Sequence, residues 1–273
     1  ASGGTTRVAQ ALERARKVSD QVMIAGLVGK VDTPVAKAAD KVLSAQVQEL
    51  GRSPGVRTYT ASLMGLIFLA IRIGEIKRHF HMEEANKFRK EIVDMAGMVH
   101  ETYLASIEPA EEAAALCKSA PFISYVGSGP SFGSASFSSA KIVEACGVFS
   151  VAQDLEEWAH VERFAYPLDF PVVIVAPPGK GYWRALELAK GVTTLGHPLI
   201  AVVDENDKDI KPMAKVVFPV KGQVREAFSP LLYYIPGTIL AYSLAKTLGR
   251  GMFMTDNEHV MKVREEMRRQ IQG

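Results

Sequence analysis

The chain has 273 residues, which is enough for one large or two modest α/β domains. Hydrophobic residues make up 48% and charged residues 23%, and 32 Lys and Arg side chains against 30 Asp and Glu side chains give a net charge of +2. This balance excludes a broad electrostatic attraction to nucleic acid or to an anionic membrane. An anionic ligand would therefore need a local site.

The cysteine content, the longest apolar run and the first residues indicate the cellular compartment that we expect for the protein. Cys117 and Cys146 are too few for a disulfide framework and lack metal-ligand spacing, so we expect buried, inert thiols in a reducing compartment. The longest apolar run, residues 63–71, stops at Arg72, and the first residues lack the pattern of a signal peptide. We expect a cytoplasmic protein without a membrane or nucleic-acid partner.

In the first half, a Ser/Gly/Thr turn at residues 2–6 precedes apolar residues that recur with helical spacing up to Val18. Short apolar runs predict buried strands, and longer amphipathic patterns predict helices. The predicted strands are 21–26 and 41–44, and the predicted helices are 34–39, 59–76 and a charged helix at 82–107 that ends at Pro109.

The second half alternates strands and helices more regularly. The predicted strands are 122–126, 148–152, 171–176, 198–203 and 214–220. The predicted helices are 132–145, 183–190 (stopped by Gly191), 230–248 and 257–270, with an aromatic and acidic segment at 155–164. This alternation predicts an α/β protein with doubly wound parallel sheets.

Two polar loops open helices and could hold an anion. Ser2, Gly3, Thr5 and Thr6 offer hydroxyls and unpaired N–H groups at the positive end of a helix dipole, or they form a plain N-cap. The second loop, residues 127–133, invites a dinucleotide-binding interpretation with Asp154 as the ribose ligand. Phe132 stands where the third glycine belongs and Pro130 removes a donor, so we expect no nicotinamide cofactor.

Three parts of the chain resemble the sugar-isomerase (SIS) domain family. Residues 1–5 resemble its phosphate-binding S-x-S-G-x-T loop without the first residues, and residues 53–60 resemble the segment that opens the last long helix of a first SIS domain. The second half resembles the second SIS domain in the isomerase part of glutamine–fructose-6-phosphate aminotransferase. It is similar in the same way to stand-alone glucosamine-6-phosphate deaminases and fructosamine deglycases.

The resemblance rests on spacing. Lys141 and Glu144 lie three positions apart, His160 follows Glu144 after sixteen positions, and Lys262 lies in the tail at the family's distance after Gly251. The chain departs from the family at residues 159–162, where Ala-His-Val-Glu stands in place of Lys-His-Gly-Pro.

The resemblance implies two doubly wound SIS domains, each a three-layer αβα sandwich. It places a first SIS domain at 1–80, which we expect to be incomplete at its N-terminus because the chain starts at Ala1 within the loop motif. A connector helix at 81–118, a second SIS domain at 119–250 and a catalytic tail at 251–273 follow. It also implies a homodimer that acts on a hexose or amino-hexose 6-phosphate by ring opening and C1–C2 proton transfer.

Each residue role is taken from the resemblance and stands beside an ordinary alternative. Glu144 would move the proton between C1 and C2, His160 would open the ring across a dimer interface, and Lys262 would form a Schiff base or polarise the ring oxygen. The alternative for each is a solvated or packed side chain without chemistry. Lys141 would pair with Glu144 or a sugar hydroxyl. The predicted phosphate and sugar ligands are Ser2, Gly3, Thr5, Thr6, Val56 and Thr58.

The acidic residues near His160 leave further alternatives. Glu156, Glu157 and Glu162 would raise its pKa or orient its ring, or they form a solvated edge. They lack a second His in register, so we expect no metal and no cofactor of any kind. A sugar-phosphate sensor without catalysis is the alternative function, although the chain has no helix-turn-helix segment.

Overall fold

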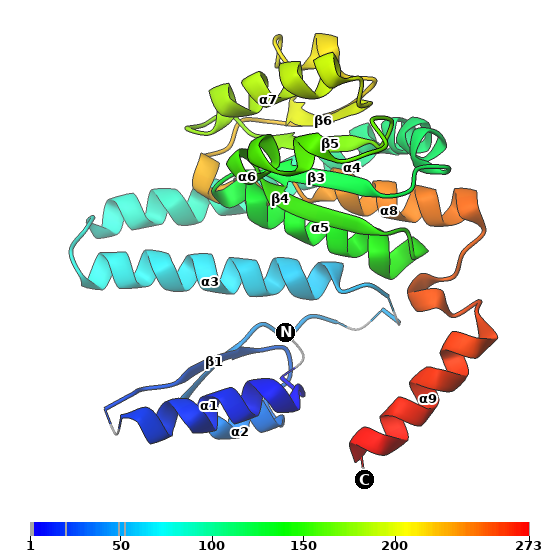
Figure 1. Ribbon diagram of the computed structural model, residues 1–273. Helices are drawn as coiled ribbons and strands as arrows, with labels where there is room; N and C mark the ends of the chain where they lie inside the picture. Colours follow the sequence, from blue (N-terminus) through cyan, green and yellow to red (C-terminus); the bar gives the residue numbers. More distant parts are fainter. Residues whose placement is uncertain (1–2, 20, 49, 52, 273) are drawn as a thin grey trace. The chain divides into compact units, whose positions relative to one another are not determined.

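The computed structural model describes residues 3–19, 21–48, 50–51 and 53–272, and the chain divides into two compact units, residues 1–91 and 92–273. Each unit is described by itself (Figure 1). Both are built from parallel strands and helices, which confirms the predicted α/β class.

Unit 1 contains a two-stranded parallel sheet among its described residues, with Ala25 paired to Lys41 and Val28 to Ser44. Its elements are α1 (Thr6–Val18), β1 (Ala25–Val28), α2 (Pro34–Ala38), β2 (Lys41–Ser44), α3 (Val56–Ile76) and the start of α4 (Met82–Cys117). Asp40 joins the strands to α1, because its carboxylate accepts from Ile24 N at 2.8 Å and pairs with Arg16 at 2.7 Å.

Unit 2 contains, within the described part of the chain, a five-stranded parallel sheet in the order β4-β3-β5-β6-β7. The strands are β3 (Ile123–Gly127), β4 (Ser150–Asp154), β5 (Val172–Ala176), β6 (Leu199–Asp204) and β7 (Val216–Val220). The helices are the rest of α4 (residues 92–117), α5 (Pro130–Cys146), α6 (Leu155–His160), α7 (Tyr182–Leu195), α8 (Ile235–Leu248) and α9 (Glu258–Gln272). There are 3₁₀ turns at 162–164, 211–213, 226–231 and 252–254.

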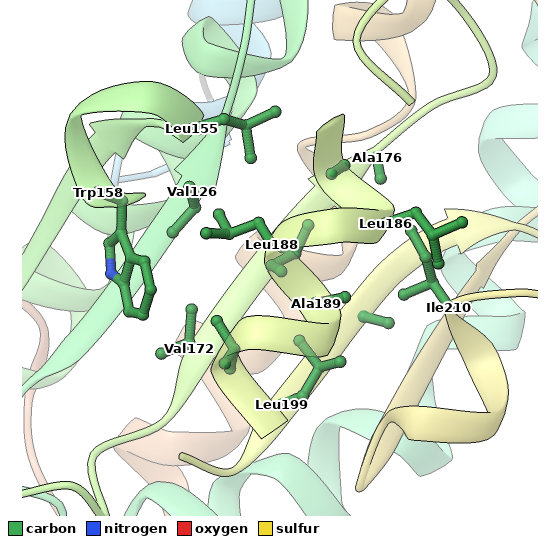
Figure 2. Packing of buried hydrophobic residues seen from close by; sticks show 14 of the residues in the cluster. Val126, Leu155, Trp158, Val172, Ala176, Leu186, Leu188, Ala189, Leu199 and Ile210 are labelled. Carbon is green, nitrogen blue, oxygen red and sulfur yellow. The ribbon is translucent and has the colours of Figure 1, made fainter. Parts of the chain in front are cut away.

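Helices cover both faces of this sheet, so β5 and β6 are buried along their whole length. Figure 2 shows the core on one face, where Trp158 of α6 and Leu188 of α7 lie with strand residues such as Val172 and Leu199. The opposite face is covered by α5 and α8, which pack against each other (Figure 1). Unit 2 is therefore a three-layer αβα sandwich.

Four sequence predictions of element bounds were wrong. The first strand is Ala25–Val28 rather than 21–26, and the predicted helix 230–248 is a 3₁₀ turn followed by α8. α4 continues through Pro109 to Cys117, because Ala110, Ala113 and Ala114 are fully buried and their packing outweighs the proline penalty of about 3 kcal/mol. α7 continues past Gly191 to Leu195 and ends at Gly196, whose φ of 97° is left-handed.

α3 differs from the other described helices in its hydropathy. It has 21 residues, and an 18-residue window within it has a mean hydropathy of 1.4, so its length and composition alone would suffice to cross a membrane. A single such helix is weak evidence for a membrane span, and 11% of the α3 window is buried. The absence of a membrane partner therefore stays a prediction.

Candidate functional site

Lys141 and Glu144 form an ion pair near the end of α5. The Lys141 ammonium also lies 4.8 Å from the centre of the Phe137 ring. The Lys141 side chain is 8% exposed and that of Glu144 is 36% exposed. A buried cation thus orients a carboxylate that stays within reach of a ligand, and such a group can accept and return a proton.

His160 ends the short helix α6. Asp154 caps this helix by accepting from Glu156 N at 3.0 Å, and buried Trp158 fixes it by donating to Ser124 Oγ at 3.1 Å. The His160 ring is 74% exposed, and its Nδ1 lies 2.8 Å from the Glu156 carbonyl oxygen. Because a carbonyl only accepts, the neutral ring carries its proton on Nδ1 and leaves Nε2 as a proton acceptor at the surface.

The acidic residues near His160 have other partners. Arg184 binds the Glu156 carboxylate at 2.5 and 2.9 Å, and these hydrogen bonds lower the pKa of Glu156. Glu162 accepts from Gln153 Nε2 at 2.8 Å. Glu156 therefore orients His160 through its backbone oxygen, and its carboxylate pairs with Arg184 while lying 4.0 Å from His160 Nδ1. The sequence analysis missed Arg184 because it lies 28 positions away, and only the packing of α6 beside α7 brings it near.

His160 and Glu144 lie at opposite edges of the sheet. α5 begins beside the carboxyl end of β3 and is about 25 Å long, at about 1.5 Å per residue. Its Ser139 hydroxyl reaches Ser150, the first residue of β4, at 2.9 Å, so Glu144 lies beyond the amino edge. The helix α6, which ends at His160, follows the carboxyl end of β4 (Figure 1). One chain therefore does not bring these two side chains together.

The predicted phosphate loop forms the start of α1 in unit 1, and Ser2 lies outside the described residues. Gly3 has a φ of 78°, and a side chain there would meet Thr33 Oγ1 at 2.3 Å, so only glycine fits. Thr5 is the N-cap residue, and its hydroxyl makes no capping bond. Thr5 and Thr6 are exposed. Because α1 begins here without a side-chain cap, its first N–H groups and two hydroxyls are available to an anion.

The remaining predicted residues lie on other helices. Val56 and Thr58 are half-buried in the first turn of α3, in the same unit as the Gly3 loop. Lys262 is exposed on α9 in unit 2. The structure pairs Lys141 with Glu144 and leaves Lys262 at the surface.

The expectations about cofactors and thiols rest on local geometry. The loop after β3 is closed by its own serine, because Ser131 Oγ accepts from Ser128 N and donates to Ser128 O. Within the described residues no group of three His, Cys, Asp or Glu side chains could hold a metal ion. The absence of a cofactor remains a prediction.

Cys117 and Cys146 are buried, and burial raises the pKa of Cys117 to about 12, as expected for an inert thiol.

The fold of the chain is similar to that of solved proteins described as phosphosugar isomerases and to that of their relatives. The C-terminal domain of glucosamine-fructose-6-phosphate aminotransferase from Francisella tularensis superposes with a TM-score of 0.81 at 19% identity. The superposition covers 93% of this chain and 71% of the Francisella chain. Glucosamine-6-phosphate deaminase from Thermotoga maritima gives a TM-score of 0.70 at 21% identity. That superposition covers 92% of this chain and 69% of the Thermotoga chain.

Sequence comparison identifies relatives with the same fold. A glutamine–fructose-6-phosphate aminotransferase of Bradyrhizobium diazoefficiens is 23% identical over 249 residues, which is 91% of this chain. The chain spans about 40% of the length of such curated relatives. No protein-family model matches it. The resemblance to SIS-domain proteins is confirmed as a similarity of sequence and of fold.

Proposed function

We propose that the chain binds a hexose or amino-hexose 6-phosphate and catalyses proton transfer between C1 and C2 of the opened sugar. The observation that carries this proposal is the Lys141–Glu144 pair, a half-exposed carboxylate held by a buried ammonium. The relatives support the ligand class, because their names specify fructose 6-phosphate or glucosamine 6-phosphate.

The reaction needs an anchor, a ring-opening group and a base. The N-terminus of α1 with Thr5 and Thr6 would hold the phosphate. His160 Nε2 would accept the proton of the anomeric hydroxyl as the C1–O5 bond breaks, and would pass that proton to the ring oxygen. Glu144 would take the proton from one sugar carbon and return it to the next, with no net loss or gain of atoms in an isomerisation. Lys141 would stabilise the Glu144 carboxylate between these steps, and Lys262 would polarise the ring oxygen.

A sugar-phosphate sensor is the second candidate. One observation favours it: His160 lies at the opposite sheet edge from Glu144, so one chain alone does not assemble the groups for ring opening and proton transfer. A second copy of the chain would supply the missing His160. The proposed enzyme is therefore a homodimer, whereas a sensor has no such requirement.

Deuterium exchange into the sugar tests the proposal. The protein is incubated in D₂O with fructose 6-phosphate, glucosamine 6-phosphate and a fructosamine 6-phosphate, and exchange at C1 and C2 is followed by NMR. We expect exchange with at least one sugar. We also expect Glu144→Gln to reduce the exchange at least 100-fold, within the usual contribution of a general base.

The control is Glu112→Gln, which removes an exposed carboxylate from α4 and should exchange at the wild-type rate. Saturable chemical-shift changes without exchange would support the sensor. No response to any of the three sugars would contradict both candidates.

A further inference from the structure

Unit 2 contains a cavity of about 370 Å³ at the carboxyl edge of its sheet. It lies between the start of α7 and the segment that follows β6. The lining residues are Pro178, Gly179, Tyr182, Trp183, Asp204, Asn206, Asp207, Lys208 and Asp209. Ligands of parallel α/β sheets bind at this edge, and the volume suits a small metabolite. None of these residues is used in the proposed reaction.

The carboxylates that line the cavity differ in their hydrogen-bond partners. Asp207 accepts from Ile210 N at 2.9 Å and Lys211 N at 3.0 Å, and the Tyr182 hydroxyl donates to its other oxygen. Asp207 therefore shapes the turn. Asp204 is only 8% exposed and accepts from Asn206 N at 2.8 Å.

Asp204 and Asp209 have no cationic partner among the residues that the structure describes. Lys208 lines the same cavity but is exposed and pairs with neither carboxylate. A buried carboxylate without a counter-ion is costly, since burial removes its hydration. A bound cation would offset that cost, whereas phosphate or another anion would be repelled.

Aromatic side chains form another wall. Trp183 is 70% exposed although it is large and apolar, and its ring centre lies 6.0 Å from that of Tyr182 at an angle of 74°. An indole face beside carboxylates attracts an organic cation through its quadrupole, by about 0.5–2 kcal/mol. The described residues around the cavity offer no set of three side chains suited to a metal ion. The ligand is therefore organic.

We infer that this cavity binds a small organic molecule with a protonated amine. The ammonium group lies against Asp204 and Asp209, and the carbon skeleton lies against Trp183. The inference does not depend on the proposed isomerase reaction, because the two sites share no residue.

Glucosamine without a phosphate is the probe, kept protonated by the pH of the buffer. Glucose is the matched neutral compound, because a hydroxyl replaces the amine. Fluorescence reports on the site, because Trp183 is exposed and the other tryptophan, Trp158, is buried. We expect glucosamine to change the fluorescence saturably, glucose to bind at least tenfold more weakly, and Trp183→Phe to abolish the signal.

Calorimetric titration measures the same affinity in variants without relying on Trp183. Asp204→Asn should weaken glucosamine binding at least tenfold. If Asp204→Asn does not fold, Asp209→Asn replaces it in the same measurement with the same expected loss, because Asp209 is an exposed side chain. Glu187→Gln removes an exposed carboxylate elsewhere on α7 and should bind normally. Equal binding of glucose and glucosamine would overturn the inference, as would the absence of binding at millimolar concentration. Neither outcome would affect the exchange experiment, which needs phosphosugars and Glu144.

Discussion

His197 is a buried histidine that lies beside two aromatic rings. It is 3% exposed, and its ring centre lies 4.2 Å from that of Phe170 and 5.9 Å from that of Trp158. Burial lowers the pKa of His197 below its ordinary value of 6.5, and the Phe170 backbone and Asp169 oppose this only in part. The folded state therefore favours the neutral ring.

This pKa shift predicts that acid destabilises unit 2. Below pH 6.5 the unfolded chain binds a proton that the folded chain takes up only at lower pH, so stability falls by up to about 1.4 kcal/mol per pH unit. We expect the loss to begin near pH 6.5 and to end at the folded pKa. His197→Phe should be nearly independent of pH between 5 and 7. Urea unfolding followed by tryptophan fluorescence measures this, because both tryptophans lie in unit 2.

His259 serves as the control because it is exposed on α9. The variant His259→Gln should retain the pH dependence of the wild type. Parallel pH dependences of the wild type and His197→Phe would show that another group titrates. The carboxyl groups with a lowered pKa, such as Asp40 and Glu205, act below about pH 4.5 and do not overlap with this window.

Single residues also show how far the sequence predicts the candidate site. The three-residue spacing of Lys141 and Glu144 predicted a pair, and helix geometry makes that pair because positions i and i+3 share a face. His160 was predicted as a candidate, whereas the ion pair of its neighbour Glu156 with Arg184 was not, since tertiary packing alone joins Glu156 and Arg184. The acidic run at residues 204–209, directly after a buried strand, was the missed signal for the cavity.

At the scale of elements, two glycines of α7 should respond oppositely to alanine. Gly191 lies inside the helix with open space around it, so Gly191→Ala should stabilise unit 2 by about 1 kcal/mol. Gly196 ends the helix with a left-handed φ of 97°, so Gly196→Ala should destabilise by about 1–2 kcal/mol. Urea unfolding followed by fluorescence compares the two variants with the wild type. Destabilisation by Gly191→Ala would contradict the helical assignment of residues 191–195.

The same helix shows why element ends resist prediction from sequence. A glycine in a helical pattern lowers local helix propensity by about 1 kcal/mol whether it ends the helix or not. Val192 is fully buried, and its packing keeps the chain helical beyond Gly191. The strands of the second half were predicted closely, because a run such as Val172–Ala176 is apolar along its length and buried on both faces.

For the whole molecule, alternating strands and helices predicted the parallel sheets, since a parallel pair requires a crossover connection. The sequence does not predict on which sheet edge each candidate residue falls. That depends on the direction in which α5 crosses the sheet, which sets Glu144 beyond the amino edge and His160 beyond the carboxyl edge. A working site would then need two chains, as proposed for the homodimer.

Mixing two inactive variants tests this requirement. Glu144→Gln and His160→Asn are each expected to lose exchange activity when pure. If each site takes Glu144 from one chain and His160 from the other, a mixed dimer retains one intact site. After unfolding and refolding the two together, random pairing should restore about a quarter of the wild-type exchange rate.

The separately refolded variants, combined without subunit exchange, serve as the control and should stay inactive. If one chain supplied both residues, every site in the mixture would lack one of them, and no activity would return. Recovery well above the level of the pure variants therefore requires His160 and Glu144 to act from different chains. The opposite sheet edges of unit 2 already separate these residues within one chain.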